Sequence, residues 1–180
     1  MRKLVAAAAG ILLLAALVAA VDATSAALEN PGGVVVFAGQ SAVPANGANG
    51  DWHTGIITTK FGCGSDAGTM ASGLDTRDSR YPYYAALPTR NALMRNIEVR
   101  GPNGKTLQMP VLDVGPFCTA DDAYVFNGAT PLTVQNQGDI IPNSRCNHHY
   151  ESTGAALDLS CKAAAALGIG GKGDADWRFV

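Results

Sequence analysis

Two aspartates, each at the end of an apolar run, could do acid–base chemistry. Residues 111–112, Val-Leu, lead into Asp113, and residues 115–116, Gly-Pro, then turn the chain. Residues 155–157, Ala-Ala-Leu, lead into Asp158. Two carboxylates brought to one cleft can work as acid and base on a glycosidic bond. The competing interpretation is that both aspartates only fix turns or cap a helix.

Aromatic side chains could supply platforms on which sugar rings stack. The competing role for such residues is packing in the core, which we weigh most heavily for Phe117. The candidates for substrate contact are Trp52, Tyr83, Tyr84, Phe117 and Tyr124.

The sequence offers little that would hold a metal or a cofactor. His148 and His149 are adjacent, but Glu151 is the one further ligand that we can name near them, so we interpret the pair as solvated loop histidines. Residues 121–122, Asp-Asp, could hold a cation, although a solvated acidic turn is the simpler interpretation. We therefore predict no metal and no cofactor.

Composition and charge favour one globular domain and argue against nucleic acid as a partner. The chain has 180 residues, of which 47% are hydrophobic and 16% charged, enough for a substantial core. The net charge is −2 and no basic run exceeds two residues, so an electrostatic footprint for nucleic acid is missing. We expect a monomer.

The N-terminus resembles a targeting segment. Residues 1–3, Met-Arg-Lys, are followed by an apolar run over 4–21 and by small residues that suit cleavage. We predict a cleaved signal peptide over 1–23 and export to the periplasm or the extracellular space, with no membrane contact after cleavage. An uncleaved anchor is the alternative. Residues 24–51 are rich in Gly, Asn and Ala and are predicted to be a flexible linker.

Four cysteines, Cys63, Cys118, Cys146 and Cys161, lie in the part predicted to be exported. An even number in an oxidising compartment indicates two disulfides, for which three pairings are possible. From position in the chain we favour Cys118–Cys146, which would close a long irregular stretch, together with Cys63–Cys161. No Cys-x-x-Cys spacing of the kind found in zinc sites occurs.

Short strands dominate the rest of the chain. Alternation and β-branched residues predict strands over 55–61, 83–87, 97–100, 106–113, 155–159 and 176–180, with a hairpin turn at 101–104. One helix is predicted over 161–167, with Ser160 as its N-cap and Gly168 after its last turn. Residues 119–150 look irregular. Many strands with one helix indicate a mainly β protein built as a small barrel.

Several motifs together resemble the double-psi β-barrel of rare lipoprotein A, which expansins, family-45 endoglucanases and membrane-bound lytic transglycosylase A share. They are Asp-x-Gly-Pro-Phe at 113–117, Leu-Asp-Leu-Ser at 157–160 before an Ala-rich helix, Ala-Ser-Gly at 71–73 and Leu-Pro at 87–88. The resemblance covers about residues 55–180, with 119–153 unmatched. It implies a six-stranded barrel domain over 52–180 with one or two short helices and an insertion.

The resemblance also implies activity on a β-1,4-linked wall glycan such as peptidoglycan. A lytic transglycosylase needs one good acid, for which it suggests Asp113, with Asp158 tuning or orienting it. At the position where rare lipoprotein A carries an important histidine, this chain has Tyr84, which does not titrate near neutral pH. The alternatives are therefore an expansin-like module that binds polysaccharide without cutting it, and a structural protein of the envelope.

Overall fold

The computed structural model describes residues 50–147 and 149–180. The predicted signal peptide, all of the predicted linker except its last two residues, and His148 lie outside the described residues. The strands are β1 (His53–Phe61), β2 (Ala85–Leu87), β3 (Asn96–Arg100), β4 (Thr106–Val114), β5 (Leu157–Ser160) and β6 (Lys172–Phe179). The helices are α1 (Asp122–Asn127), α2 (Leu132–Gln135) and α3 (Cys161–Leu167), with two 3-10 turns, η1 (Gly64–Asp66) and η2 (Arg90–Ala92).

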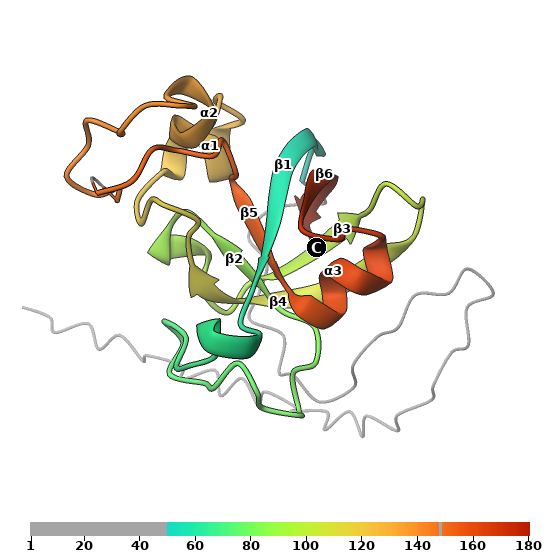
Figure 1. Ribbon diagram of the computed structural model, residues 1–180. Helices are drawn as coiled ribbons and strands as arrows, with labels where there is room; N and C mark the ends of the chain where they lie inside the picture. The colour runs from blue at the N-terminus through green and yellow to red at the C-terminus, as the bar shows by residue number, and fades with distance from the viewer. Residues whose placement is uncertain (1–49, 148) are drawn as a thin grey trace, which may run out of the picture. The chain divides into compact units, whose positions relative to one another are not determined.

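The six described strands close into a barrel in the order β1-β5-β2-β4-β3-β6. The pairs β1–β5 and β2–β4 are parallel, and the other four neighbouring pairs are antiparallel. Strand β5 therefore lies between β1 and β2, as Figure 1 shows. The prediction of a mainly β, closed six-stranded barrel is confirmed.

Alternation along the strands divides inner from outer side chains. In β5, Leu157 and Leu159 are completely buried while Asp158 between them is half-buried. The same period of two places Ala85 and Leu87 of β2 inside the barrel. The largest fully buried side chains of the main core include Trp177, Tyr124, Leu87, Ile97, Leu157, Leu159, Leu167 and Val111.

Helix α3 has the predicted bounds and caps. The Ser160 hydroxyl oxygen accepts a hydrogen bond from the Ala163 N–H at 3.2 Å, and Gly168 takes the left-handed conformation with φ 83°. Ala163 and Leu167 lie one turn apart on the same face of α3 and are completely buried, so this helix covers part of the barrel core.

The hairpin β3–β4 turns where predicted and packs against the end of α3. A Cβ at Gly101 would lie 2.2 Å from the Leu167 carbonyl oxygen, so only glycine fits at this approach. The Asn103 side-chain amide donates to the Ala166 carbonyl at 3.0 Å, which satisfies one of the free carbonyls at the helix end.

Both disulfides have the predicted pairing. Cys63–Cys161 joins the loop after β1 to the first residue of α3, and Cys118–Cys146 closes the stretch that follows β4. Among the described residues no cysteine is free. Two disulfides are typical of exported proteins.

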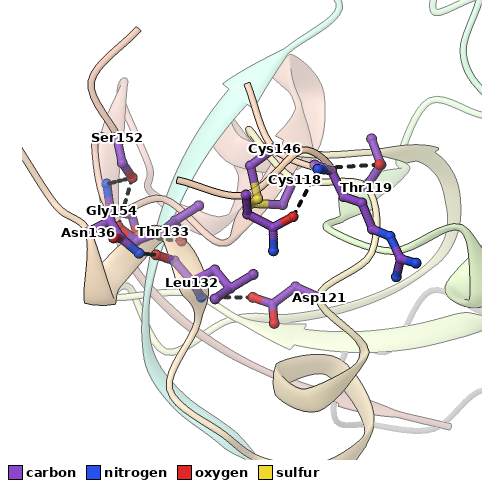
Figure 2. Close-up of a disulfide and its surroundings, with 11 residues drawn as sticks. Cys118, Thr119, Asp121, Leu132, Thr133, Asn136, Cys146, Ser152 and Gly154 are labelled. Carbon is purple, nitrogen blue, oxygen red and sulfur yellow. Dashed lines mark hydrogen bonds between the residues drawn. A yellow bond between two sulfur atoms is a disulfide. The ribbon is translucent and has the colours of Figure 1, made fainter. Parts of the chain in front are cut away.

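The stretch after β4 is more regular than predicted, because it contains α1 and α2. Asp121 and Asp122, interpreted from the sequence as a solvated turn, are hydrogen-bonded instead. Asp121 is 4% exposed and its carboxylate accepts from the Leu132 N–H at 2.8 Å (Figure 2), while Asp122 accepts from the Thr89 hydroxyl. Burial raises the pKa of Asp121. Both carboxylates thus hold the chain in place.

Other bounds differ by a few residues. Strand β6 begins at Lys172, four residues before the predicted start at 176, because residues 172–175 pair with β1 although they lack β-branched side chains. Strand β5 begins at Leu157 and not at Ala155. No helix of the described residues is long and apolar enough to cross a membrane.

Candidate functional site

The two candidate aspartates lie in one row of paired residues across four strands. Thr59 of β1 pairs with Asp158 of β5, Asp158 pairs with Ala86 of β2, and Ala86 pairs with Asp113 of β4. Paired residues project from the same face of a sheet. We call Thr59, Asp158, Ala86 and Asp113 the aspartate row. Neighbouring strands are about 4.8 Å apart, so the two aspartate backbones, with β2 between them, lie about 10 Å apart.

A register shift in β4 brings Asp113 into the row. Ala85 pairs with Val111, but Ala86 pairs with Asp113, so Leu112 is an extra residue on β4. Without this bulge Asp113 would lie opposite Leu87, whose side chain belongs to the barrel core. The bulge therefore moves the carboxylate from the inner face to the outer face, where Asp158 also lies.

Asp158 has the environment of a proton donor. Its side chain is half-buried, and Oδ1 accepts a hydrogen bond from the Thr59 hydroxyl, which leaves Oδ2 to carry a proton. Burial raises the pKa of Asp158 to about 6, the hydrogen bond from Thr59 acts in the opposite direction, and the charges of Asp66 and Asp113 add to the rise. This carboxyl is thus partly protonated near neutral pH.

Asp113 is fixed by backbone donors. Its Oδ1 accepts from the Ala71 N–H at 2.8 Å and from the Val114 N–H at 2.9 Å. The adjacent Ser72 N–H donates to the Leu112 carbonyl at 3.0 Å. The Ala-Ser-Gly stretch at 71–73 is thereby attached to β4 beside the candidate carboxylate. Asp113 has a structural role in addition to any chemical one.

Tyr84 does not offer a face to a sugar. Its side chain is 3% exposed, its ring packs edge-to-face against Phe61 at 5.3 Å, and its hydroxyl donates to the Thr76 carbonyl at 3.0 Å. Burial raises the pKa of the Tyr84 hydroxyl. The expectation that Tyr84 stacks on substrate is therefore corrected. Its ring instead packs against the loop over 62–83 and holds that loop next to the barrel.

The other aromatic candidates are placed as follows. Tyr124 is 1% exposed and its hydroxyl accepts from the Trp177 indole N–H at 2.7 Å, so it is a core residue and not a platform. Phe117 is half-buried against the cluster of Cys118 and Cys146. Tyr83 is half-buried against the main core. None of these three candidates belongs to the aspartate row.

Trp52 is half-buried, and two cations lie near its ring. The guanidinium groups of Arg100 and Arg178 lie 4.7 Å and 4.6 Å from its ring centroid. His149 and Glu151 are exposed. Within residues 50–147 and 149–180 no group of three or more His, Cys, Asp or Glu side chains is arranged to hold a metal ion.

Sequence reasoning missed Thr59 and Ala86. Thr59 lies in the strand predicted over 55–61, where it counted only as one of several β-branched residues. Ala86 matters because it is small and lies between the two carboxylates. The signal that could have found both is register, which requires knowing that β1, β5, β2 and β4 are neighbours, and strand order is a tertiary property.

Comparison with known proteins identifies no family for this chain. No protein-family model matches the chain, and no curated protein matches it. A solved structure, the "Streptomyces papain inhibitor (SPI)", is similar with a TM-score of 0.40 and 20% sequence identity, over 73% of this chain and 96% of that chain. We draw no functional inference from this likeness.

Proposed function

We propose that the protein cleaves a β-1,4-linked wall glycan, with Asp158 as the acid and base of a lytic-transglycosylase-like reaction. The observation that supports this most is the half-buried Asp158 carboxyl, whose pKa is raised to about 6, on the same outer face as Asp113. A general acid works best when its pKa is near the working pH. The acid role moves to Asp158 from Asp113, which the sequence had favoured.

The reaction needs one carboxyl that gives and then takes a proton. Asp158 donates its proton from Oδ2 to the glycosidic oxygen as the bond from the anomeric carbon to that oxygen breaks. The resulting carboxylate then accepts the proton of the sugar's own 6-hydroxyl as that oxygen bonds to the anomeric carbon. The products are a shortened glycan and a 1,6-anhydro sugar, and Asp158 ends protonated as it began. Asp113, held through Oδ1, has Oδ2 available to accept a sugar hydroxyl.

The test is digestion of purified peptidoglycan followed by mass spectrometry of the soluble products. We expect 1,6-anhydro sugars, with a rate that falls as the pH rises above about 6, because the acid must be protonated. Asp158→Asn should remove this activity and Asp113→Asn should weaken it. Asp174→Asn, at an exposed position of β6, is the matched control. Failure of the wild type to release soluble sugar at any pH from 4 to 8 contradicts the proposal.

A second candidate function is supported by Tyr84. Its hydroxyl donates to a backbone carbonyl and is held away from neutral-pH titration by burial, so it cannot relay a proton as a histidine could. An expansin-like module would bind the glycan through the same face without cutting it. Co-sedimentation with peptidoglycan and with cellulose, without soluble products, would select this function over cleavage. Neither binding nor cleavage would leave an envelope interaction protein as the remaining candidate.

A further inference from the structure

A second feature, separate from the aspartate row, has the properties of a binding site. A cleft of about 730 Å³ lies between the first residues of β1 and the segment 124–131. Its volume is within the range of about 300–1,000 Å³ that is typical of small-molecule sites. No member of the aspartate row lines it. We call it the aromatic cleft, and its lining includes Trp52, His53, Arg95, Tyr124, Phe126 and Phe179.

One cation, Arg95, lies in this cleft against two aromatic rings. Its guanidinium carbon is 3.5 Å from the centroid of the Phe179 ring and 5.4 Å from that of Phe126. The two rings are nearly parallel, with an interplanar angle of 7° and centroids 5.6 Å apart. A guanidinium stacked on a ring keeps its N–H edge free to bind a carboxylate in two parallel hydrogen bonds.

That N–H edge has no protein partner among the described residues. The guanidinium takes part in none of their side-chain hydrogen bonds and in none of their four ion pairs, which use Arg77, Arg80, Arg100 and Arg178. Every fully buried side-chain nitrogen or oxygen of the described part has a partner, so the unpaired nitrogens of Arg95 must reach solvent. Burial lowers the pKa of Arg95, but a guanidinium stays charged at any ordinary pH.

We propose that the aromatic cleft binds a carboxylate carried next to an apolar group. The carboxylate pairs with the guanidinium edge of Arg95, and the apolar body lies against Phe126, which is 38% exposed, and against the half-buried Val134. Such a group is found on a free organic acid and at the C-terminus of a peptide. This inference does not depend on the activity proposed for the aspartate row.

Besides the buried Tyr124 hydroxyl, two other titratable groups line the cleft and set the charge that a ligand meets. His53 stacks on Trp177 at 4.0 Å, and burial lowers its pKa, so it is neutral at neutral pH. Asp51 is exposed and lines the same cleft. Its negative charge opposes the binding of an anion, so the removal of this charge should strengthen binding.

The experiment is calorimetric titration of the purified full chain with N-acetyl-L-phenylalanine and, as the matched probe without a charge, N-acetyl-L-phenylalanine amide. A bidentate charge-assisted pair is worth about 10- to 100-fold in affinity. We therefore expect saturable binding of the acid and binding of the amide that is weaker by at least about tenfold. Equal affinity for the two probes, or no saturable binding of the acid, overturns the proposal without the use of any variant.

Variants then test the residue assigned. Arg95→Gln should weaken binding of the acid by about 10- to 100-fold and leave the amide unchanged. Asp51→Asn should tighten binding of the acid. Arg145→Gln removes an exposed arginine that does not line the cleft and should change neither. Unchanged binding of the acid by a folded Arg95→Gln protein assigns the carboxylate elsewhere and overturns the proposal.

The source of the carboxylate is distinguished with a third probe, N-acetyl-Ala-Ala-Phe, in its free and amidated forms. If this peptide binds at least about tenfold more tightly than N-acetyl-L-phenylalanine, the cleft takes peptide C-termini. If the two bind equally, it takes the free acid. Both results support the shared chemistry, and the failure of glycan cleavage would bear on neither.

Discussion

The aspartate row and the stretch over 119–153 position their side chains in different ways. In the row, each residue is fixed by strand pairing, so the single extra residue Leu112 moves Asp113 from one face to the other. In the stretch, separate contacts hold the chain: the Cys118–Cys146 disulfide and the hydrogen bond from Leu132 to Asp121. We therefore expect a substitution in the barrel to affect the stability of all its strands. Loss of one contact in the stretch should affect only the residues near that contact.

The largest expected loss of stability comes from removing a disulfide. The two disulfides differ in the length of chain that each one closes. Cys63 and Cys161 are 98 residues apart, so loss of their bond should cost about 4.7 kcal/mol in unfolding free energy. Cys118 and Cys146 are 28 residues apart, for which the same loop-entropy relation gives about 3.6 kcal/mol. Urea unfolding of the two double Cys→Ser variants measures both. A larger loss for the 118–146 pair would contradict the contrast.

Leu167→Ala tests whether the barrel responds as a unit. Leu167 is completely buried in the main core, so truncation should cost about 2–5 kcal/mol and lower the protection of amide hydrogens throughout the barrel. Ile141→Ala is the matched change, since Ile141 is 1% exposed in the separate cluster with Cys118 and Cys146. Its effect on hydrogen exchange should stay within 119–153. Equal spreading of both effects would remove the distinction.

Asp158→Asn should make the protein more stable at pH 7. The folded-state pKa of about 6 exceeds the ordinary 3.8, so the folded state binds the proton more tightly than the unfolded state. The contribution of Asp158 to the unfolding free energy of the wild type therefore rises as the pH falls from 7 through 6 towards 4, by about 3 kcal/mol at most. The variant should lack this rise.

The measurement for Asp158 is the unfolding free energy of wild type minus that of Asp158→Asn, because other carboxylates contribute in the opposite direction. The pKa of Asp176, for example, is lowered by its hydrogen bonds to Gly55 and Arg100 despite some burial. A difference that does not vary with pH would show that Asp158 is not the shifted group. Asp174→Asn controls for the loss of one surface charge.

The smallest expected change in stability concerns the N-caps of helices α3 and α2. Ser160→Ala removes the hydroxyl that accepts from Ala163 and donates to Pro82, and should cost about 1 kcal/mol. Helix α2 has no such side-chain cap, so Thr130→Ala just before it should change stability by less than about 0.5 kcal/mol. Thermal unfolding of both variants measures the difference, and equal shifts would mean that capping does not distinguish them.

A feature could be predicted from the sequence when it depends mainly on residues that are close together in the chain. The bounds and caps of α3, the hairpin turn at 101–104 and the disulfide pairs depend on neighbours in sequence or on few possibilities. Asp158 and Asp113 were recognised as candidates, but which of them is desolvated depends on strand neighbours. The bulge at Leu112 and the burial of Tyr84 and Tyr124 also depend on tertiary contacts, which single-residue patterns do not encode.

The stretch after β4 begins and ends at almost the same place, which matters for re-engineering this molecule. The Cα atoms of Cys118 and Cys146 are 3.9 Å apart, and the two residues face each other in an antiparallel bridge. Two chain ends this close need hardly any span to be rejoined. The exposed residues 126–130 of the segment between them can therefore be shortened or exchanged for a foreign loop, whereas Tyr124 and Val125 must stay because they belong to the main core.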